Sequence, residues 1–96
     1  MNKKILFSQP TIVINKFGMH ARPAAKIAQM AMEGFGNIWL STGSSGVDAS
    51  SIIDILTLGA ERGSKILIQA ESDRDREIVG EIKAFFDIGF GELDNE

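Results

Sequence analysis

Apolar and polar side chains alternate along this chain with changing period, and each change marks a predicted element. From 21 to 33, polar side chains recur three and four positions apart, at Lys26, Gln29 and Glu33, with apolar side chains around them. This spacing predicts a helix with one solvent-facing stripe. Pro23 fits its first turn, where a missing N–H breaks no helical hydrogen bond, and two of the three residues after Glu33 are glycines, which end helices.

Two more helices are predicted further along the chain. Ser51 and Asp54 form an Asp-bearing variant of a capping box, which predicts a short helix through about Leu58. A long last helix is predicted to begin at Ser72, with Asp75 three residues on as its capping partner. Its apolar positions follow helical spacing: Ile78, Val79, Ile82, Phe85 and Phe86. The segment after it, 89–96, is acidic, and we expect it to fray.

Four segments rich in β-forming residues complete the pattern. They are residues 5–15, interrupted by Pro10 and ending near Asn15, residues 37–41, a short stretch around Val47, and residues 65–70. A glycine- and serine-rich turn joins the second to the third, which predicts a hairpin. The order strand, helix, strand, strand, helix, strand, helix lacks the strict alternation of a parallel sheet. It predicts an α+β fold in which helices cover one face of an antiparallel sheet.

Composition narrows the function classes. The 96 residues are expected to form one domain, 1–96, and the net charge of −3 argues against a protein that binds nucleic-acid phosphates. There is no cysteine and a single histidine, so thiolate and multi-histidine metal sites are excluded, and we expect neither a metal nor another cofactor. The chain starts with positive charge, but its first apolar stretch is too short for an export signal, and no run is long enough to span a bilayer. A cytoplasmic protein without membrane insertion is expected.

The histidine, His20, lies where a glycine-containing loop meets the first helix. Unpaired first-turn N–H groups carry partial positive charge there and attract anions, and Arg22 adds a planar cation that can bind two oxygens. The same field favours a neutral ring with a nucleophilic lone pair, which suits a phosphoryl acceptor. A lone histidine at a helix start is also commonly a cap or a solvent-exposed residue, and this alternative stays open at the level of the residues alone.

The residues around His20 carry a family resemblance. Gly18-Met19-His20-Ala21-Arg22-Pro23-Ala24-Ala25 resembles the active-site motif of the HPr family, histidine-containing phosphocarriers of the bacterial phosphoenolpyruvate-dependent phosphotransferase system. The resemblance extends over about residues 8–88, which leaves a short N-terminal extension and the acidic C-terminal tail outside it. It implies a four-stranded antiparallel sheet covered on one face by three helices.

The resemblance also implies a function. His20 would accept a phosphoryl group on Nδ1 from phosphorylated enzyme I and pass it to sugar-specific IIA domains, and Arg22 would stabilise the phosphoryl group. The protein would be a group carrier in a transferase system rather than a stand-alone catalyst, and we expect a monomer.

Two further features follow from the resemblance. A docking patch for enzyme I and other partners would comprise Met19, Ala21, Ala25, Ile52, Ile53 and Leu56. From the residues alone, one of the two isoleucines that follow Ser51 is expected in the core and the other on the surface. Ser51 aligns with the serine that a dedicated serine kinase/phosphorylase modifies in many HPr proteins, although Ser50 stands where many members have lysine. Ser51 can equally be a simple helix cap.

Two other functions remain compatible with the sequence. The same motif occurs in carriers of a nitrogen-related branch of the phosphotransferase system, and the motif does not separate the two branches. The first other function is that of a nitrogen-branch or regulatory HPr-like protein that acts mainly by docking on regulator proteins. The second is that of a domain of this fold that has lost its partners.

Overall fold

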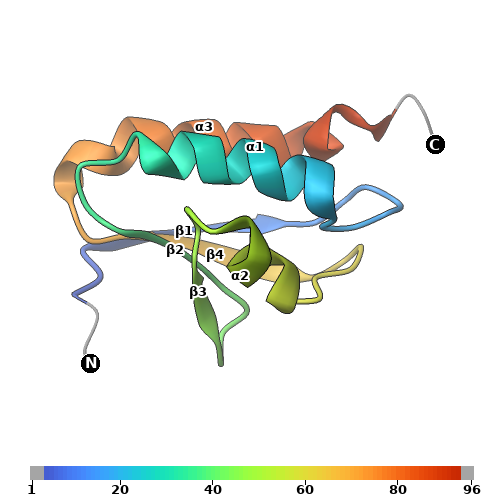
Figure 1. The fold of residues 1–96 in the computed structure, drawn as a ribbon, viewed down its shortest axis with the longest axis horizontal. Helices are drawn as coiled ribbons and strands as arrows, with labels where there is room; N and C mark the ends of the chain where they lie inside the picture. The colour runs from blue at the N-terminus through green and yellow to red at the C-terminus, as the bar shows by residue number, and fades with distance from the viewer. Residues whose placement is uncertain (1–3, 94–96) are drawn as a thin grey trace.

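The computed structural model describes residues 4–93 as one four-stranded sheet with helices packed on it (Figure 1). In chain order the elements are β1 (Phe7–Ile12), α1 (Ala21–Met32), β2 (Ile38–Ser41), β3 (Gly46–Asp48), α2 (Ile52–Thr57), β4 (Lys65–Ala70), η1 (Asp73–Asp75), α3 (Arg76–Asp87) and η2 (Gly89–Gly91), where η marks a single 3-10 turn. The predicted α+β architecture, an open-faced sandwich of four antiparallel strands and three helices, is confirmed. None of the helices within residues 4–93 is long and apolar enough to cross a membrane.

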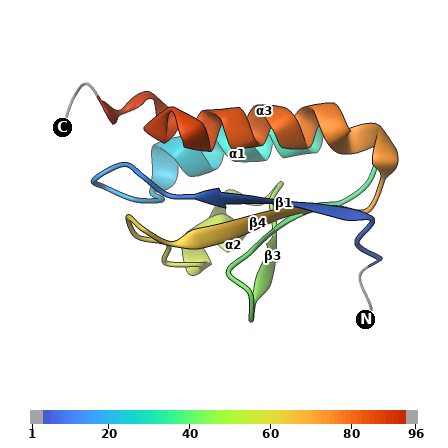
Figure 2. The same ribbon diagram turned by 180° about the vertical axis from the view of Figure 1, so that it is seen from behind.

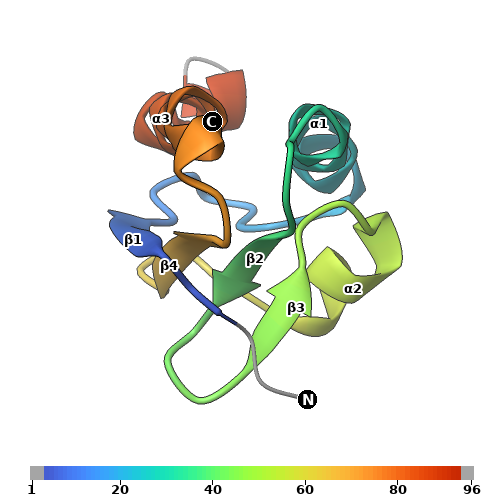
Figure 3. The same ribbon diagram turned by 90° about the vertical axis from the view of Figure 1, so that its left-hand side faces the viewer.

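The strands follow the order β1-β4-β2-β3, and every neighbouring pair is antiparallel. The last strand in the sequence is therefore central, as the end-on view shows (Figure 3). In β4 the buried residues alternate with more exposed ones, so Ile66, Ile68 and Ala70 point toward the helices. β2 and β3 form the predicted hairpin, with Leu40 opposite Val47.

The first strand differs from its prediction. It runs through Pro10, which pairs with Leu67, and it ends at Ile12 rather than near Asn15. Proline is tolerated because β1 is an edge strand, so one side of its backbone has no partner strand. Beyond Ile12 the chain leaves the sheet.

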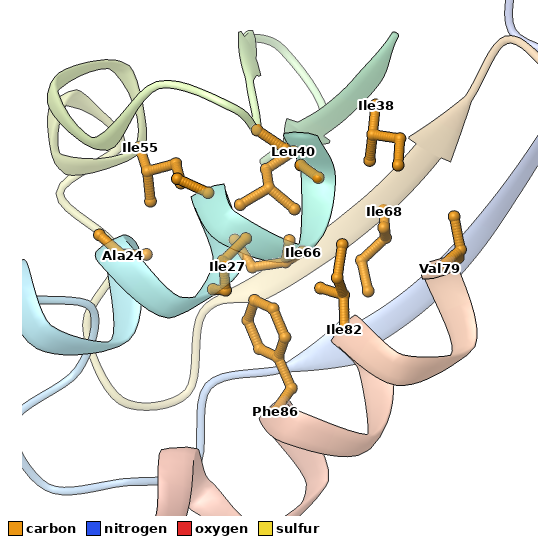
Figure 4. Close-up of a cluster of buried hydrophobic side chains, with 14 of the residues drawn as sticks. Ala24, Ile27, Ile38, Leu40, Ile55, Ile66, Ile68, Val79, Ile82 and Phe86 are labelled. Carbon is orange, nitrogen blue, oxygen red and sulfur yellow. The ribbon is translucent and has the colours of Figure 1, made fainter. Parts of the chain in front are cut away.

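The core fills the space between the sheet and the two long helices (Figure 4). Ile27 from α1, Leu40 from β2, and Ile82 and Phe86 from α3 are fully buried there. Burying a side chain of this size stabilises the fold by about 1.5–3 kcal/mol. Figure 4 shows Phe86 pointing from α3 toward Ile27. The solvent stripe of α1 is as predicted, and Met32, at the end of the helix, is exposed as well.

The start of the last helix differs from its prediction. A 3-10 turn precedes α3, and the Ser72 hydroxyl accepts the N–H of Arg74. The side chain of Asp75 is fully buried and accepts the backbone N–H groups of Phe35 and Gly36, at 2.8 and 2.9 Å. Asp75 therefore ties the α1–β2 connection to the start of α3 instead of completing a cap with Ser72.

Candidate functional site

His20 is the N-cap residue of α1. Its backbone is extended, its carbonyl accepts the N–H of Ala24 at 3.0 Å, and its side chain makes no capping hydrogen bond. The side chain is 36 % exposed, and that of Arg22, in the first turn, is 74 % exposed. The ring and the guanidinium therefore stand together at the positive end of a 12-residue helix, as the sequence predicted.

The loop before His20 is fixed by close backbone contacts. Gly18 has a left-handed φ of +67°, and a Cβ there would lie 2.7 Å from the carbonyl oxygen of Ala60. The next residue, Met19, donates its N–H to that same oxygen at 2.9 Å. Only glycine meets both demands without strain, so the loop delivers His20 to the helix start in one defined position.

Glu92 completes the site, and the sequence analysis missed it. One carboxylate oxygen, Oε2, lies 2.7 Å from Nε2 of His20 and 2.5 Å from Nη2 of Arg22. The other oxygen, Oε1, accepts a hydrogen bond of 2.8 Å from Nδ2 of Asn15. Residues 70 or more positions apart are thus joined at one carboxylate.

A turn after α3 brings Glu92 to this place. Gly89, Phe90 and Gly91 all have left-handed φ values, +59°, +58° and +74°. Phe90 is buried, and its ring centroid lies 5.1 Å from that of Phe85 and 4.9 Å from that of Phe86. Figures 1 and 2 show this turn at the same end of the molecule as the loop that precedes α1.

The prediction that the tail frays is therefore wrong for residues 89–93, and residues 94–96 lie outside the described part of the chain. A signal for this turn was present in the sequence. A glycine directly after a helix, followed by a large apolar residue, is typical of a chain that folds back against its helix.

The electrostatics favour an ionised Glu92. Burial of the carboxyl group raises its pKa, but hydrogen bonds from Arg22, Asn15 and His20 and the electrostatic attraction of His20 outweigh burial and hold the pKa below its usual value of 4.5. The side chain of Glu92 is 4 % exposed. The Asn15 side chain is fully buried as well, and its second polar atom, Oδ1, has no hydrogen-bond partner.

The residues predicted for docking lie on α1 and α2, which pack against each other, except for Met19 in the loop before α1. Ile53 is 75 % exposed, and Ile52 and Leu56 are each 39 % exposed. The expectation that one of the two isoleucines enters the core is wrong, because the buried residue of this helix is Ile55. Met19 packs partly against the core, Ala25 is half-buried and Ala21 is exposed. Figure 1 shows α2 beside the half of α1 that begins at Ala21.

Ser51 caps α2. Its hydroxyl accepts the N–H of Asp54 at 3.2 Å, so this half of the predicted capping box is confirmed. The Ser50 hydroxyl donates to Asp48 Oδ1 at 2.6 Å, in the connection between β3 and α2.

The site around His20 is a surface site. A hollow of about 610 Å³ is lined by residues of β1, β4, the β2–β3 turn and α3, but its lining includes none of the residues that gather at His20. Within residues 4–93, no three His, Cys, Asp or Glu side chains come together in a group that could hold a metal ion. The chemistry at His20 is thus carried by one exposed ring edge, one guanidinium, one buried carboxylate and the start of a helix.

Comparison with known proteins identifies this arrangement. The family model described as "PTS HPr component phosphorylation site" matches residues 7–87. Among curated proteins, the chain is 31 % identical to the phosphocarrier protein HPr of Cupriavidus necator, over 91 % of this chain and 98 % of that protein. It is 35 % identical to the phosphocarrier protein NPr of Escherichia coli K12, over 88 % of this chain and 94 % of that protein.

A solved structure of HPr from Thermoanaerobacter tengcongensis superposes with a TM-score of 0.83 at 32 % identity, and covers 91 % of this chain and 98 % of that one. The predicted resemblance is therefore confirmed, and the chain belongs to the HPr family of phosphocarrier proteins of the phosphotransferase system.

Proposed function

We propose that this protein accepts a phosphoryl group on Nδ1 of His20 from phosphorylated enzyme I and passes it to sugar-specific IIA domains. One observation carries the proposal. The His20 ring is partly exposed at the start of α1, and its Nε2 is already engaged by Glu92. Nδ1 is then the ring nitrogen left for an incoming phosphorus atom.

The surroundings of His20 suit a phosphorylated ring. The first helical turn contains no acidic residue, and no side chain within residues 4–93 caps it. Its unpaired N–H groups and the Arg22 guanidinium can therefore meet the new negative charge. A partner that covers the ring would supply the donor and exclude water, so this chain needs no deep pocket of its own.

Mass spectrometry tests the proposal. The protein is incubated with enzyme I, phosphoenolpyruvate and Mg²⁺, with enzymes I of the sugar and nitrogen branches in separate reactions, and its intact mass is measured. We expect one acid-labile phosphate on the wild type, none on His20→Ala, and wild-type behaviour for Lys26→Ala on the exposed face of the same helix. Phosphate on a folded His20→Ala variant, or none on the wild type with either enzyme, would contradict the proposal.

The exposed residues of α2 support a docking role. Ile52, Ile53 and Leu56 present apolar surface on a six-residue helix beside α1. Clusters of exposed apolar side chains mark interaction surfaces in soluble proteins. We propose that enzyme I and IIA domains cover them together with Met19, Ala21 and Ala25.

Ile53→Glu tests the docking patch, with Leu6→Glu before β1 as the matched control, because that side chain is 58 % exposed. We expect the patch variant to raise the KM of enzyme I for this protein at least about tenfold. Its free energy of unfolding should change by less than about 0.5 kcal/mol. Equal KM values for the two variants would remove the patch from docking.

The alternative function is that of a nitrogen-branch or regulatory protein that acts mainly by docking on regulators. One observation favours keeping it: the similar proteins include both HPr and NPr phosphocarriers. Comparing the rates with the two enzymes I separates the branches, since the cognate enzyme should transfer faster. Phosphorylation of Ser51 by a serine kinase stays a prediction. A phosphate there would add negative charge beside the docking residues and would weaken docking rather than alter His20.

A further inference from the structure

We propose that Glu92 is a positioning residue for phosphoryl transfer. Its carboxylate holds the ring proton of His20 on Nε2, so that Nδ1 presents its lone pair to the phosphoryl donor. The inference rests on the proposed function and deepens it, because it assigns a task to the segment after α3.

The hydrogen bonds define which ring nitrogen carries the proton. An ionised carboxylate can only accept hydrogen bonds, so the 2.7 Å contact between Oε2 and Nε2 of His20 requires the proton on Nε2. In a neutral imidazole the other nitrogen is then unprotonated. The tautomer that the carboxylate selects is the one with a nucleophilic Nδ1.

The carboxylate cannot rotate freely to another partner. Its second oxygen is held by Nδ2 of Asn15, whose other amide N–H bonds to the carbonyl of Gly18 at 2.9 Å. Asn15 is fully buried, and Phe90, two residues before Glu92, is anchored among the rings of α3. The group that orients the histidine is thus itself oriented from both sides, as partners of functional histidines commonly are.

The transfer step balances with this proton assignment. The Nδ1 lone pair of His20 forms a bond to the phosphorus of the donor phosphohistidine, and the donor's N–P bond breaks with its electron pair returning to the donor nitrogen. The proton stays on Nε2, so the phosphorylated ring becomes cationic and Glu92 balances its charge. When the phosphoryl group leaves for the next acceptor, the pair of the Nδ1–P bond returns to Nδ1 and a neutral ring is restored.

Glu92 also holds Arg22 beside the reacting ring. The same Oε2 atom bonds to Nη2 of Arg22, whose side chain is otherwise largely exposed. A long arginine side chain loses rotamer freedom when it is fixed, so a carboxylate that fixes it beforehand lowers that cost during transfer. The same oxygen, Oε2 of Glu92, therefore determines both the tautomer of His20 and the position of the Arg22 guanidinium.

Glu92→Gln is the decisive variant because it keeps the shape and removes the charge. The amide oxygen is needed to accept from Nδ2 of the buried Asn15, so the NH₂ group faces His20 and Arg22. It donates to Nε2 of His20, and the largely exposed Arg22 side chain loses its partner and turns away. The proton then moves to Nδ1 and the nucleophilic lone pair is lost. Glu92→Ala removes the preference without reversing it, and Glu81→Gln, on the exposed face of α3, is the matched control.

Two measurements test the inference. The first is ¹⁵N NMR of the His20 ring in the unphosphorylated protein at neutral pH. We expect a protonated Nε2 and an unprotonated Nδ1 in the wild type and in Glu81→Gln, and the reverse in Glu92→Gln. An unchanged tautomer in Glu92→Gln, with the fold intact by circular dichroism, would overturn the inference.

The second measurement is the single-turnover rate of phosphoryl acceptance from excess phosphorylated enzyme I. We expect Glu92→Gln to be slower by at least about tenfold, with Glu92→Ala between it and the wild type. If the three proteins accepted phosphate at equal rates, or if Glu92→Ala were faster than the wild type, the carboxylate would not be a positioning group. If the wild type took no phosphate at all, the proposed function and the inference built on it would both fail, whereas a fast wild type with fast variants contradicts only the inference.

Discussion

The loop before α1 and the turn after α3 meet at His20, but they are held there by different means. The loop is fixed through its backbone, since Met19 donates its N–H to the carbonyl of Ala60 and Gly18 packs directly against that carbonyl. In the turn after α3, the N–H groups of Ile88, Gly91 and Glu92 donate to carbonyls of the turn itself or of the last turn of α3. Two side chains connect this turn to the rest: the ring of Phe90 and the carboxylate of Glu92.

This difference predicts how each segment fails. A segment held by its backbone tolerates the loss of an exposed side chain but not a new atom pressed against its carbonyl contact. A segment held by two side chains detaches when either is removed, and its strained backbone then relaxes without a clash. The two halves of the site can therefore be disturbed separately.

Removing the Phe90 ring is expected to have the largest effect. Phe90→Ala loses the contacts with Phe85 and Phe86 and leaves a cavity, which costs about 3 kcal/mol in the free energy of unfolding. Phe17→Ala is the counterpart in the loop, where the ring is 64 % exposed, and it should cost less than about 0.5 kcal/mol. Urea denaturation of both variants checks this. Similar losses for the two would mean that the turn is not held by its side chain.

Adding one methyl group to the loop is expected to have the next largest effect. Gly18→Ala combines a left-handed φ of +67° with a Cβ 2.7 Å from a backbone oxygen, which cannot move aside as a side chain can. We expect a loss of about 2 kcal/mol in the free energy of unfolding and faster amide exchange at Met19. A stability within about 0.5 kcal/mol of the wild type would show that the backbone contact does not hold the loop.

The loop before α1 could be predicted from the sequence because its sequence signals are local. A glycine, a histidine and a proline within six residues, followed by apolar positions at helical spacing, define both the loop and the start of α1. Strand β4 and the Ser51 cap were found in the same way, from patterns that span a few residues. Each of these features is decided by neighbours in the chain.

The long-range hydrogen bonds of the two buried carboxylates could not be predicted from local sequence patterns. Asp75 accepts from backbone groups some 40 residues away, and Glu92 bonds to residues 70 or more positions away. Their local sequence suggests a helix cap in one case and an acidic tail in the other. Partners of a buried carboxylate depend on which loops the sheet order brings together, and no periodicity in the chain encodes that.

The third largest effect is expected for Gly89→Ala, which adds a methyl group to the turn after α3 and can be compared directly with Gly18→Ala in the loop. In Gly89→Ala the new Cβ would lie 2.5 Å from Cγ of Leu93, but that side chain is 44 % exposed and can swing away. The remaining cost is the left-handed backbone at φ +59°, so we expect a loss of about 1 kcal/mol, less than for Gly18→Ala. Gly91→Ala, with open space around the Cβ, isolates the backbone cost.

Urea denaturation of the glycine variants ranks them. Equal losses for Gly89→Ala and Gly91→Ala would show that Leu93 yields freely. A loss for Gly89→Ala as large as that for Gly18→Ala would instead mean that the turn resists displacement as a backbone-held loop does.

The smallest expected effect concerns Glu92, the second side chain that connects the turn after α3 to the rest of the protein. It is expected to depend on pH. The pKa of this carboxyl group is lower in the folded protein than its usual value of 4.5. Its contribution to stability is therefore fully present above about pH 4.5 and is lost as the pH falls through the pKa of the folded state. Glu92→Gln should therefore be less stable than the wild type at pH 7, but by less than about 1 kcal/mol, because Arg22 is largely exposed and its pairing is weakened by water.

Urea denaturation of the wild type and Glu92→Gln from pH 7 down to pH 3 measures this difference. The two stabilities should converge as Glu92 becomes protonated, since the carboxyl then carries no more charge than the amide. The Glu81→Gln variant, which changes an exposed side chain, should follow the wild type throughout. A gap between wild type and Glu92→Gln that does not shrink in acid would mean that the carboxylate holds the turn by shape alone, and the charge at His20 would then serve transfer rather than stability.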